Sequence, residues 1–122
     1  MIKDIHNDVV GQSEDALQQK CYFWFWNTFP KFRGLLFSVP NGGTRDPREV
    51  IKFKQTGLVP GVSDLIFLFD GNCFLIELKR DFKGAKQSKN QLNWQKTVEN
   101  QGFEYFIVRT LEDFKHLIFK II

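Results

Sequence analysis

Residues 65–79 read LIFLFDGNCFLIELK, two apolar runs separated by a short turn sequence. The runs at 65–69 and 74–79 have the length and residue types of β-strands, and Asp70-Gly71-Asn72 between them is typical of a hairpin turn. The first run is almost continuously apolar, so we expect it to be buried on both faces and to lie centrally in a sheet. The stretch predicts an antiparallel hairpin at the centre of the fold.

Four residues with helix-capping side chains precede stretches of helical periodicity: Ser13, Asp46, Ser88 and Thr110. Each predicts a helix, and the first three end near residues 29, 56 and 101. Short strands are expected at 35–39 and 105–108. A strand, a helix and a strand in succession imply a right-handed crossover and a partly parallel sheet. We therefore expect a single compact α/β domain over residues 1–122, with an N-terminal arm at 1–12 and a mixed four-stranded central sheet flanked by helices.

The composition is that of a globular protein, with 122 residues, 43% of them hydrophobic, and a net charge of +3. Fourteen Phe and three Trp supply enough apolar area for a core. Cys21 and Cys73 lie far apart in no metal-like spacing, and no signal peptide precedes them, so we expect reduced thiols in a cytoplasmic protein. No apolar run approaches the roughly 20 residues that span a bilayer, so no membrane role is expected.

The second strand of the hairpin carries charged residues on one face. Side chains alternate along a strand, so Glu77 and Lys79 should project side by side, about 7 Å apart. Asp64 stands at the start of the first strand. With the turn centred near residue 71, Asp64 and Glu77 should fall opposite each other. The pattern predicts two carboxylates and a lysine at one end of the hairpin.

Paired carboxylates form an oxygen-rich site suited to Mg²⁺ or Mn²⁺. Such an ion lowers the pKa of a bound water and neutralises charge on a phosphate, while Lys79 can orient or deprotonate the attacking water or stabilise the transition state. These parts suffice for phosphodiester hydrolysis. The alternative is that Glu77 and Lys79 form only the polar face of a half-exposed strand, because a Glu-x-Lys triplet is common.

Basic residues gather in two parts of the chain. The segment from Lys79 to Lys96 holds six of them against one acid, and a second group surrounds the turn in the middle of the sequence. Either group alone is typical of a solvated face. Because the two groups flank the candidate site, we expect contacts with nucleic-acid phosphates from Arg45, Arg80, Lys83, Lys86 and Lys89.

Several short motifs resemble a known family: VPNGG at 39–43, GVSD at 61–64, IELK at 76–79 and Ser88-x-x-Gln91-x-x-Trp94. From Ser13 to Leu117 the chain resembles the virus-type replication-repair nuclease (VRR-NUC) domain of the PD-(D/E)XK nuclease superfamily, in a stand-alone minimal form. The resemblance implies a restriction-endonuclease-like fold and a Mg²⁺- or Mn²⁺-dependent DNA endonuclease. It further implies a homodimer acting on branched DNA such as four-way junctions, in a bacterial or phage-infected cell.

The resemblance also assigns roles within the central motif. Asp64 and Glu77 would bind the metal together with the backbone carbonyl of Leu78, and Lys79 would be the catalytic lysine. One departure stands beside them, because Ser63 replaces the family's proline before the aspartate. Proline there shapes the turn and supplies no chemistry, so we expect a small shift in geometry and retained activity.

Two further residues match family positions but have simpler explanations. Glu14 matches an acidic position that adds a metal or water contact, and a first-turn acid also complements the helix dipole. Gln91 matches a catalytic glutamine, and it also occupies the reciprocal position of a capping box with Ser88. Both explanations stay open for each residue.

Two rival functions remain beside the nuclease. One is a non-catalytic nucleic-acid-binding module with a nuclease-like fold, which the intact Asp64, Glu77 and Lys79 argue against. The other is a structural dimer, motivated by aromatic residues in and after the first helix: Trp24, Trp26, Phe29 and Phe32. Most of these aromatics are expected to be core instead.

Overall fold

The computed structural model of the protein describes residues 13–40, 46–80 and 86–122. Its strands are β1 (Leu36–Ser38), β2 (Leu65–Phe69), β3 (Asn72–Leu78) and β4 (Glu104–Val108). They form one sheet in the order β1-β2-β3-β4, with the first three antiparallel and β4 parallel to β3. The predicted mixed four-stranded sheet is confirmed. The predicted arm at 1–12, the turn glycines at 42–43, Arg45 and Lys83 lie outside the described residues.

The β2–β3 hairpin has the predicted register. Leu65 pairs with Ile76, so the next pair outward brings Asp64 opposite Glu77. The turn consists of Asp70 and Gly71, whose φ angles of 51° and 77° are both positive, as in the tight turns that match strand twist. Sequence and turn geometry together therefore fix which side chains meet at the open end of the hairpin.

The prediction that β2 is buried on both faces is wrong. Leu65 and Phe67 are fully buried on one face, but Leu68 on the other face is 41% exposed. The reason lies in the helix cover, since the helix on that face packs against β4 and leaves β2 open. The strand buried on both faces is β3, from Phe74 to Leu78.

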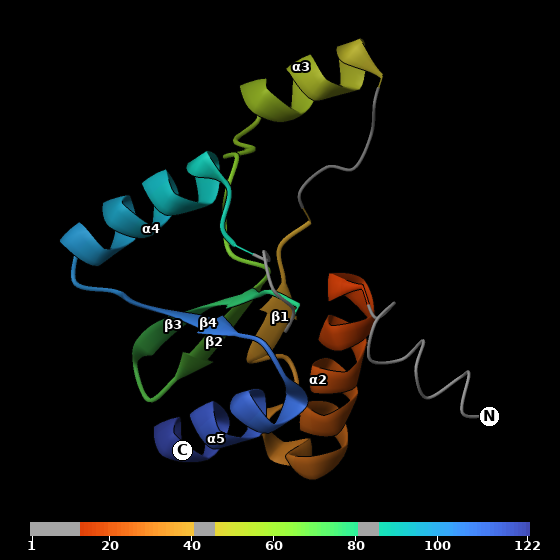
Figure 1. Ribbon diagram of the computed structural model, residues 1–122, viewed down its shortest axis with the longest axis vertical. Helices are drawn as coiled ribbons and strands as arrows, with labels where there is room; N and C mark the ends of the chain where they lie inside the picture. Colours follow the sequence, from red (N-terminus) through yellow and green to blue (C-terminus); the bar gives the residue numbers. More distant parts are fainter. Residues whose placement is uncertain (1–12, 41–45, 81–85) are drawn as a thin grey trace.

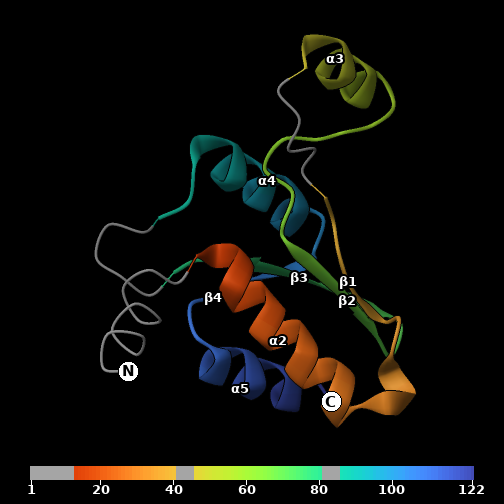
Figure 2. The same cartoon turned by 90° about the vertical axis from the view of Figure 1, so that its right-hand side faces the viewer.

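Two helices cover one face of the sheet. Helix α2 (Glu14–Thr28) and α5 (Leu111–Ile121) pack against each other and against the sheet, as Figures 1 and 2 show. Their caps are the predicted ones, with the Ser13 hydroxyl accepting from the Ala16 N–H and Thr110 from the Asp113 N–H. The core lies between these helices and the strands and includes Leu17, Cys21, Phe25, Phe67, Ile76, Phe114 and Ile118.

Helix α4 (Lys89–Asn100) lies on the opposite face and makes the crossover from β3 to β4 (Figure 2). Helix α3 (Pro47–Gln55) extends away from the sheet and has no buried residue, and a short 3₁₀ helix, η1 (Pro30–Phe32), follows α2. Since β3 and β4 run parallel, their C-terminal ends lie at the same end of the sheet, where Asp64 stands at the start of the antiparallel β2. No helix among the described residues is both long and apolar enough to cross a membrane.

The aromatics considered for a dimer interface are mostly core residues. Trp24, Phe29 and Phe32 pack against the buried cluster, and Trp24 contacts Phe114 with ring centroids 5.9 Å apart. Trp26 is 40% exposed. Most of the apolar surface of α2 is therefore used in the core of the domain.

Candidate metal centre and catalytic site

Asp64 is held at the end of the sheet by backbone contacts on both sides. Its carbonyl accepts from the Val39 N–H at 3.0 Å, which extends the β1–β2 pairing by one residue. Its carboxylate oxygen Oδ2 accepts from the Leu78 N–H at 2.8 Å. The side chain of Asp64 is therefore fixed against β3, next to Glu77.

Glu77 is the most deeply buried charged residue among those that the structure describes. It is 1% exposed, on the face of β3 that α4 covers. Its Oε2 accepts from the Gln91 side-chain amide at 2.7 Å. Its Oε1 is buried and has no hydrogen-bond partner among the described residues. A buried carboxylate oxygen without a partner is costly, so this atom suits protonation or the binding of a cation.

Gln91 both completes the cap of α4 and contacts Glu77. Its side-chain oxygen accepts from the Ser88 N–H at 2.8 Å, while the Ser88 hydroxyl accepts from the Gln91 N–H, which completes the capping box of α4. Its amide nitrogen donates to Glu77. One amide group therefore ties the N-terminus of α4 to the acidic pair.

Lys79 follows directly after β3 and is 7% exposed. Its backbone N–H donates to the Val108 carbonyl at 2.9 Å, so the chain beyond β3 remains fixed to the sheet. Its ammonium group lies 3.8 Å from a carboxylate oxygen of Glu14, in the first turn of α2. Glu14 thus contacts the lysine in addition to standing at the positive end of the helix dipole.

Burial dominates the electrostatics of the two carboxyl groups. It raises the pKa of Glu77 to about 8, an effect increased by the negative charge of Asp64 and opposed by Lys79. Burial also raises the pKa of Asp64, against the effect of the Leu78 N–H. Without a cation the site therefore holds a proton near neutral pH, and a divalent cation would compensate both negative charges.

The donor set suits a hard divalent cation. It offers two adjacent carboxylates, and one of them has a buried oxygen for which the described part of the chain provides no hydrogen-bond partner. The N–H and C=O of a strand residue point to the same edge, so the Leu78 carbonyl faces the edge that Asp64 occupies. No group of three His, Cys, Asp or Glu side chains able to hold a metal occurs among the described residues. The set fits a cation that keeps several waters, as Mg²⁺ does, better than one that needs a full protein cage.

The basic residues predicted to contact phosphates are only partly placed. Lys86 and Lys89 are exposed, Lys86 just before α4 and Lys89 as its first residue. The Arg80 carbonyl accepts from the Arg109 guanidinium at 3.2 Å, and Arg80 is partly buried. Arg45 and Lys83 fall in the segments outside the description given above.

Two residues near the site have roles that their sequence positions did not reveal. Ser63 is fully buried, and its hydroxyl donates to the Leu65 carbonyl at 3.2 Å. Gly61 has a φ of +87°, and a Cβ at its position would lie 2.3 Å from the Asn90 carbonyl oxygen. Gly61 thus allows the loop before β2 to touch the first turn of α4. A glycine at this point of the GVSD motif is the kind of sequence signal that indicates such a close approach of two backbones.

Comparison with known proteins supports the fold. A solved structure described as a VRR_NUC domain protein matches with a TM-score of 0.71, over 89% of this chain and 87% of that one, at 21% sequence identity. No family model matches the chain, and no curated protein matches it in sequence. The chain therefore has a VRR_NUC-like fold, as the sequence resemblance predicted.

Proposed function

We propose that this protein is a metal-dependent endonuclease of the PD-(D/E)XK type, belonging to the VRR-NUC family, that hydrolyses DNA phosphodiester bonds. The observation that carries the proposal is the pair of half-buried Asp64 and buried Glu77, with Lys79 close to both and no hydrogen-bond partner for Oε1 of Glu77 among the described residues. The VRR_NUC-like fold supports it. A protein that only bound DNA would gain nothing from two carboxylates facing a phosphate backbone.

Each residue then has a definite task. Asp64, Glu77 and the Leu78 carbonyl would hold Mg²⁺ or Mn²⁺, and the ion would supply positive charge to lower the pKa of a bound water and to neutralise the scissile phosphate. Lys79 orients the attacking water or stabilises charge on the phosphate. Its ammonium group is positioned for this by the contact with Glu14.

Gln91 acts as a positioning residue. Its hydrogen bond to Oε2 of Glu77 fixes the carboxylate so that Oε1 remains available. Partners of metal ligands commonly orient them in this way, and their loss costs about 10- to 100-fold in affinity or activity. Lys86 and Lys89 at the start of α4, and Arg80 after β3, are proposed to hold flanking phosphates.

The proposal is tested by incubating the purified protein with single-stranded, duplex and four-way-junction DNA, with Mg²⁺, with Mn²⁺ or with EDTA. We expect cleavage only with a metal, and a loss of at least about 100-fold in Glu77→Gln and Lys79→Met. Glu104→Gln, an exposed acid at the start of β4, is the matched control and should cut normally. If no substrate is cut under any condition, the nuclease proposal fails. If both variants cut normally, the site is elsewhere.

Branched DNA as the preferred substrate and a homodimer as the active form are part of the proposal. A two-fold dimer would place two sites for paired cuts on opposing strands. Sedimentation of the protein alone and with a four-way junction tests the assembly, and comparison of cutting rates on the junction and its separate arms tests the substrate.

A further inference from the structure

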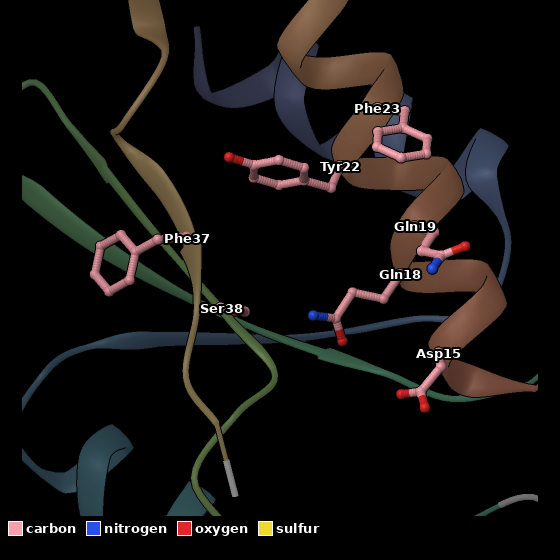
Figure 3. Close-up of a pocket in the computed structure, with 7 residues that line it drawn as sticks. All are labelled: Asp15, Gln18, Gln19, Tyr22, Phe23, Phe37 and Ser38. Carbon is pink, nitrogen blue, oxygen red and sulfur yellow. The ribbon is translucent and has the colours of Figure 1, made fainter.

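A cavity of about 490 Å³ lies between α2 and β1, beside the catalytic site. Asp15, Gln18 and Tyr22 line it from the helix, and Phe37 and Ser38 from the strand. Figure 3 shows the Gln18 and Tyr22 side chains extending from α2 toward β1, while the Phe37 ring projects from the other side of the strand. None of these side chains is used by the proposed reaction.

On both sides of the cavity, a residue next to a lining residue in the sequence contacts Asp64 or Lys79. On the strand side, Ser38 pairs with Leu65, and the next residue along the chain is hydrogen-bonded to Asp64. On the helix side, Asp15 follows Glu14, which contacts Lys79. Gln18 and Tyr22 lie one and two helical turns from Glu14, about 6 and 12 Å along the axis. A group in the cavity is therefore within one or two nucleotides of a phosphate at the site.

The lining favours a nucleobase over a phosphate. No Lys or Arg lines this cavity in the described part of the chain, and Asp15 would repel a phosphate. An aromatic ring, a carboxamide and a carboxylate are the groups that stack on a base and bond to its edge. The volume of about 490 Å³ leaves room for a base, and the polar and aromatic lining selects it over a phosphate.

The Tyr22 ring packs against a neighbouring aromatic ring of α2, which restricts its movement. Its centroid lies 6.0 Å from that of Trp26. The Arg33 guanidinium lies 4.6 Å from the Trp26 ring centroid and donates from Nε to the Trp26 carbonyl at 2.9 Å. Arg33 thereby holds Trp26, which in turn limits the movement of Tyr22. A stacking surface that is already ordered loses little entropy on binding.

We infer that this cavity binds one unpaired base of the DNA substrate next to the scissile phosphate; the inference rests on the proposed nuclease function. Tyr22 stacks on the base, and Gln18 and Asp15 bond to its edge. The Gln18 carboxamide can accept from the N6 amino group of adenine and donate to its N7, a pair of bonds that thymine cannot form, so an unpaired adenine is preferred to an unpaired thymine. A base inside an intact duplex must first be unstacked, which directs the protein to DNA with unpaired nucleotides.

The test measures binding in EDTA, so that it does not depend on cleavage. Fluorescence anisotropy compares a fully paired duplex with duplexes that carry one unpaired adenine or one unpaired thymine. We expect the full chain to bind the unpaired adenine most tightly. Tyr22→Ala should weaken that binding about tenfold, which corresponds to about 1.4 kcal/mol, and leave binding of the paired duplex unchanged. Phe103→Ala, at an exposed aromatic outside the cavity, is the control.

A second variant keeps the test decisive if Tyr22→Ala does not fold. Gln18→Ala changes a half-buried polar side chain outside the core and should abolish the preference for adenine over thymine. Unchanged preferences in the folded variants would overturn the inference, even if the protein cuts DNA. An adenine preference that depends on Tyr22, in a protein that cuts nothing with Mn²⁺, would overturn the nuclease proposal alone.

Discussion

Replacing Gly61 with alanine adds one methyl group where the loop before β2 meets the first turn of α4. The new Cβ would lie 2.3 Å from the Asn90 carbonyl oxygen and 2.8 Å from the Gln91 nitrogen. Ordinary van der Waals contact begins at 3.4 Å, so the two backbones must separate by about 1.1 Å, the difference between 3.4 and 2.3 Å. Both obstacles are backbone atoms, which cannot rotate away as a side chain would.

That displacement acts on the site through Gln91. Its hydrogen bond to Glu77 is 2.7 Å long, and a retreat of the helix by about 1 Å takes the two groups beyond hydrogen-bonding distance. Misplacement by about 1 Å can cost about 100-fold in rate. The left-handed backbone at Gly61 adds a loss of about 1–2 kcal/mol in the free energy of unfolding.

The assay measures kcat/KM for DNA cleavage at saturating Mn²⁺, together with urea unfolding. Gly34→Ala is the control, because Gly34 also has a positive φ, +94°, but a Cβ there meets nothing within 4 Å. We expect both variants to lose stability and only Gly61→Ala to lose about 100-fold in activity. If folded Gly61→Ala cuts DNA as fast as Gly34→Ala does, the position of α4 does not control Glu77, and the reasoning is refuted.

Three further changes separate the roles of the neighbouring residues. In EDTA, the free energy of unfolding should fall as pH rises from about 5 to about 8, because folded Glu77 keeps a proton that the unfolded chain releases near pH 4.5. Urea unfolding across this pH range measures the effect, which should be absent in Glu77→Gln. Gln91→Ala should lower the rate of cleavage about 10- to 100-fold. Ser88→Ala should lower the free energy of unfolding by about 1 kcal/mol and cut DNA at a near-normal rate. If the two variants cut DNA at the same rate, Gln91 only caps α4. Glu14→Gln should lower cleavage about tenfold and change stability by less than about 1 kcal/mol, since the carboxylate is 41% exposed, and unchanged kinetics would mean that the contact does not position Lys79.

The sequence was informative where the determinants are local. The turn at Asp70 and Gly71 and the two-residue alternation of the strands fix the hairpin register, and they place Asp64 opposite Glu77. The capping residues Ser13 and Ser88 fix the first residues of two helices. These features depend on residues a few positions apart, which a single sequence displays.

The rest of the site depends on contacts between distant segments. The approach of Gly61 to Asn90 and the burial of Oε1 of Glu77 arise only when α4 packs over the sheet. The burial of β2 on both faces was predicted wrongly for the same reason, because its apolar sequence does not say how far the helices extend. The contact of Glu14 with Lys79 likewise joins two segments that are far apart in the sequence and that no local pattern connects.

A calorimetric titration of the metal-free protein with Mn²⁺ at pH 7 tests the central claim that Asp64 and Glu77 hold a divalent cation. Because burial raises the pKa of Glu77 to about 8, binding should release a proton, which appears as a dependence of the heat on the buffer's ionisation enthalpy. Glu77→Gln and Asp64→Asn should bind at least about tenfold more weakly, and binding by Glu77→Gln should release fewer protons. A metal centre at this site would be contradicted if the unchanged protein did not bind Mn²⁺. It would also be contradicted if both variants bound Mn²⁺ with the affinity and proton release of the unchanged protein.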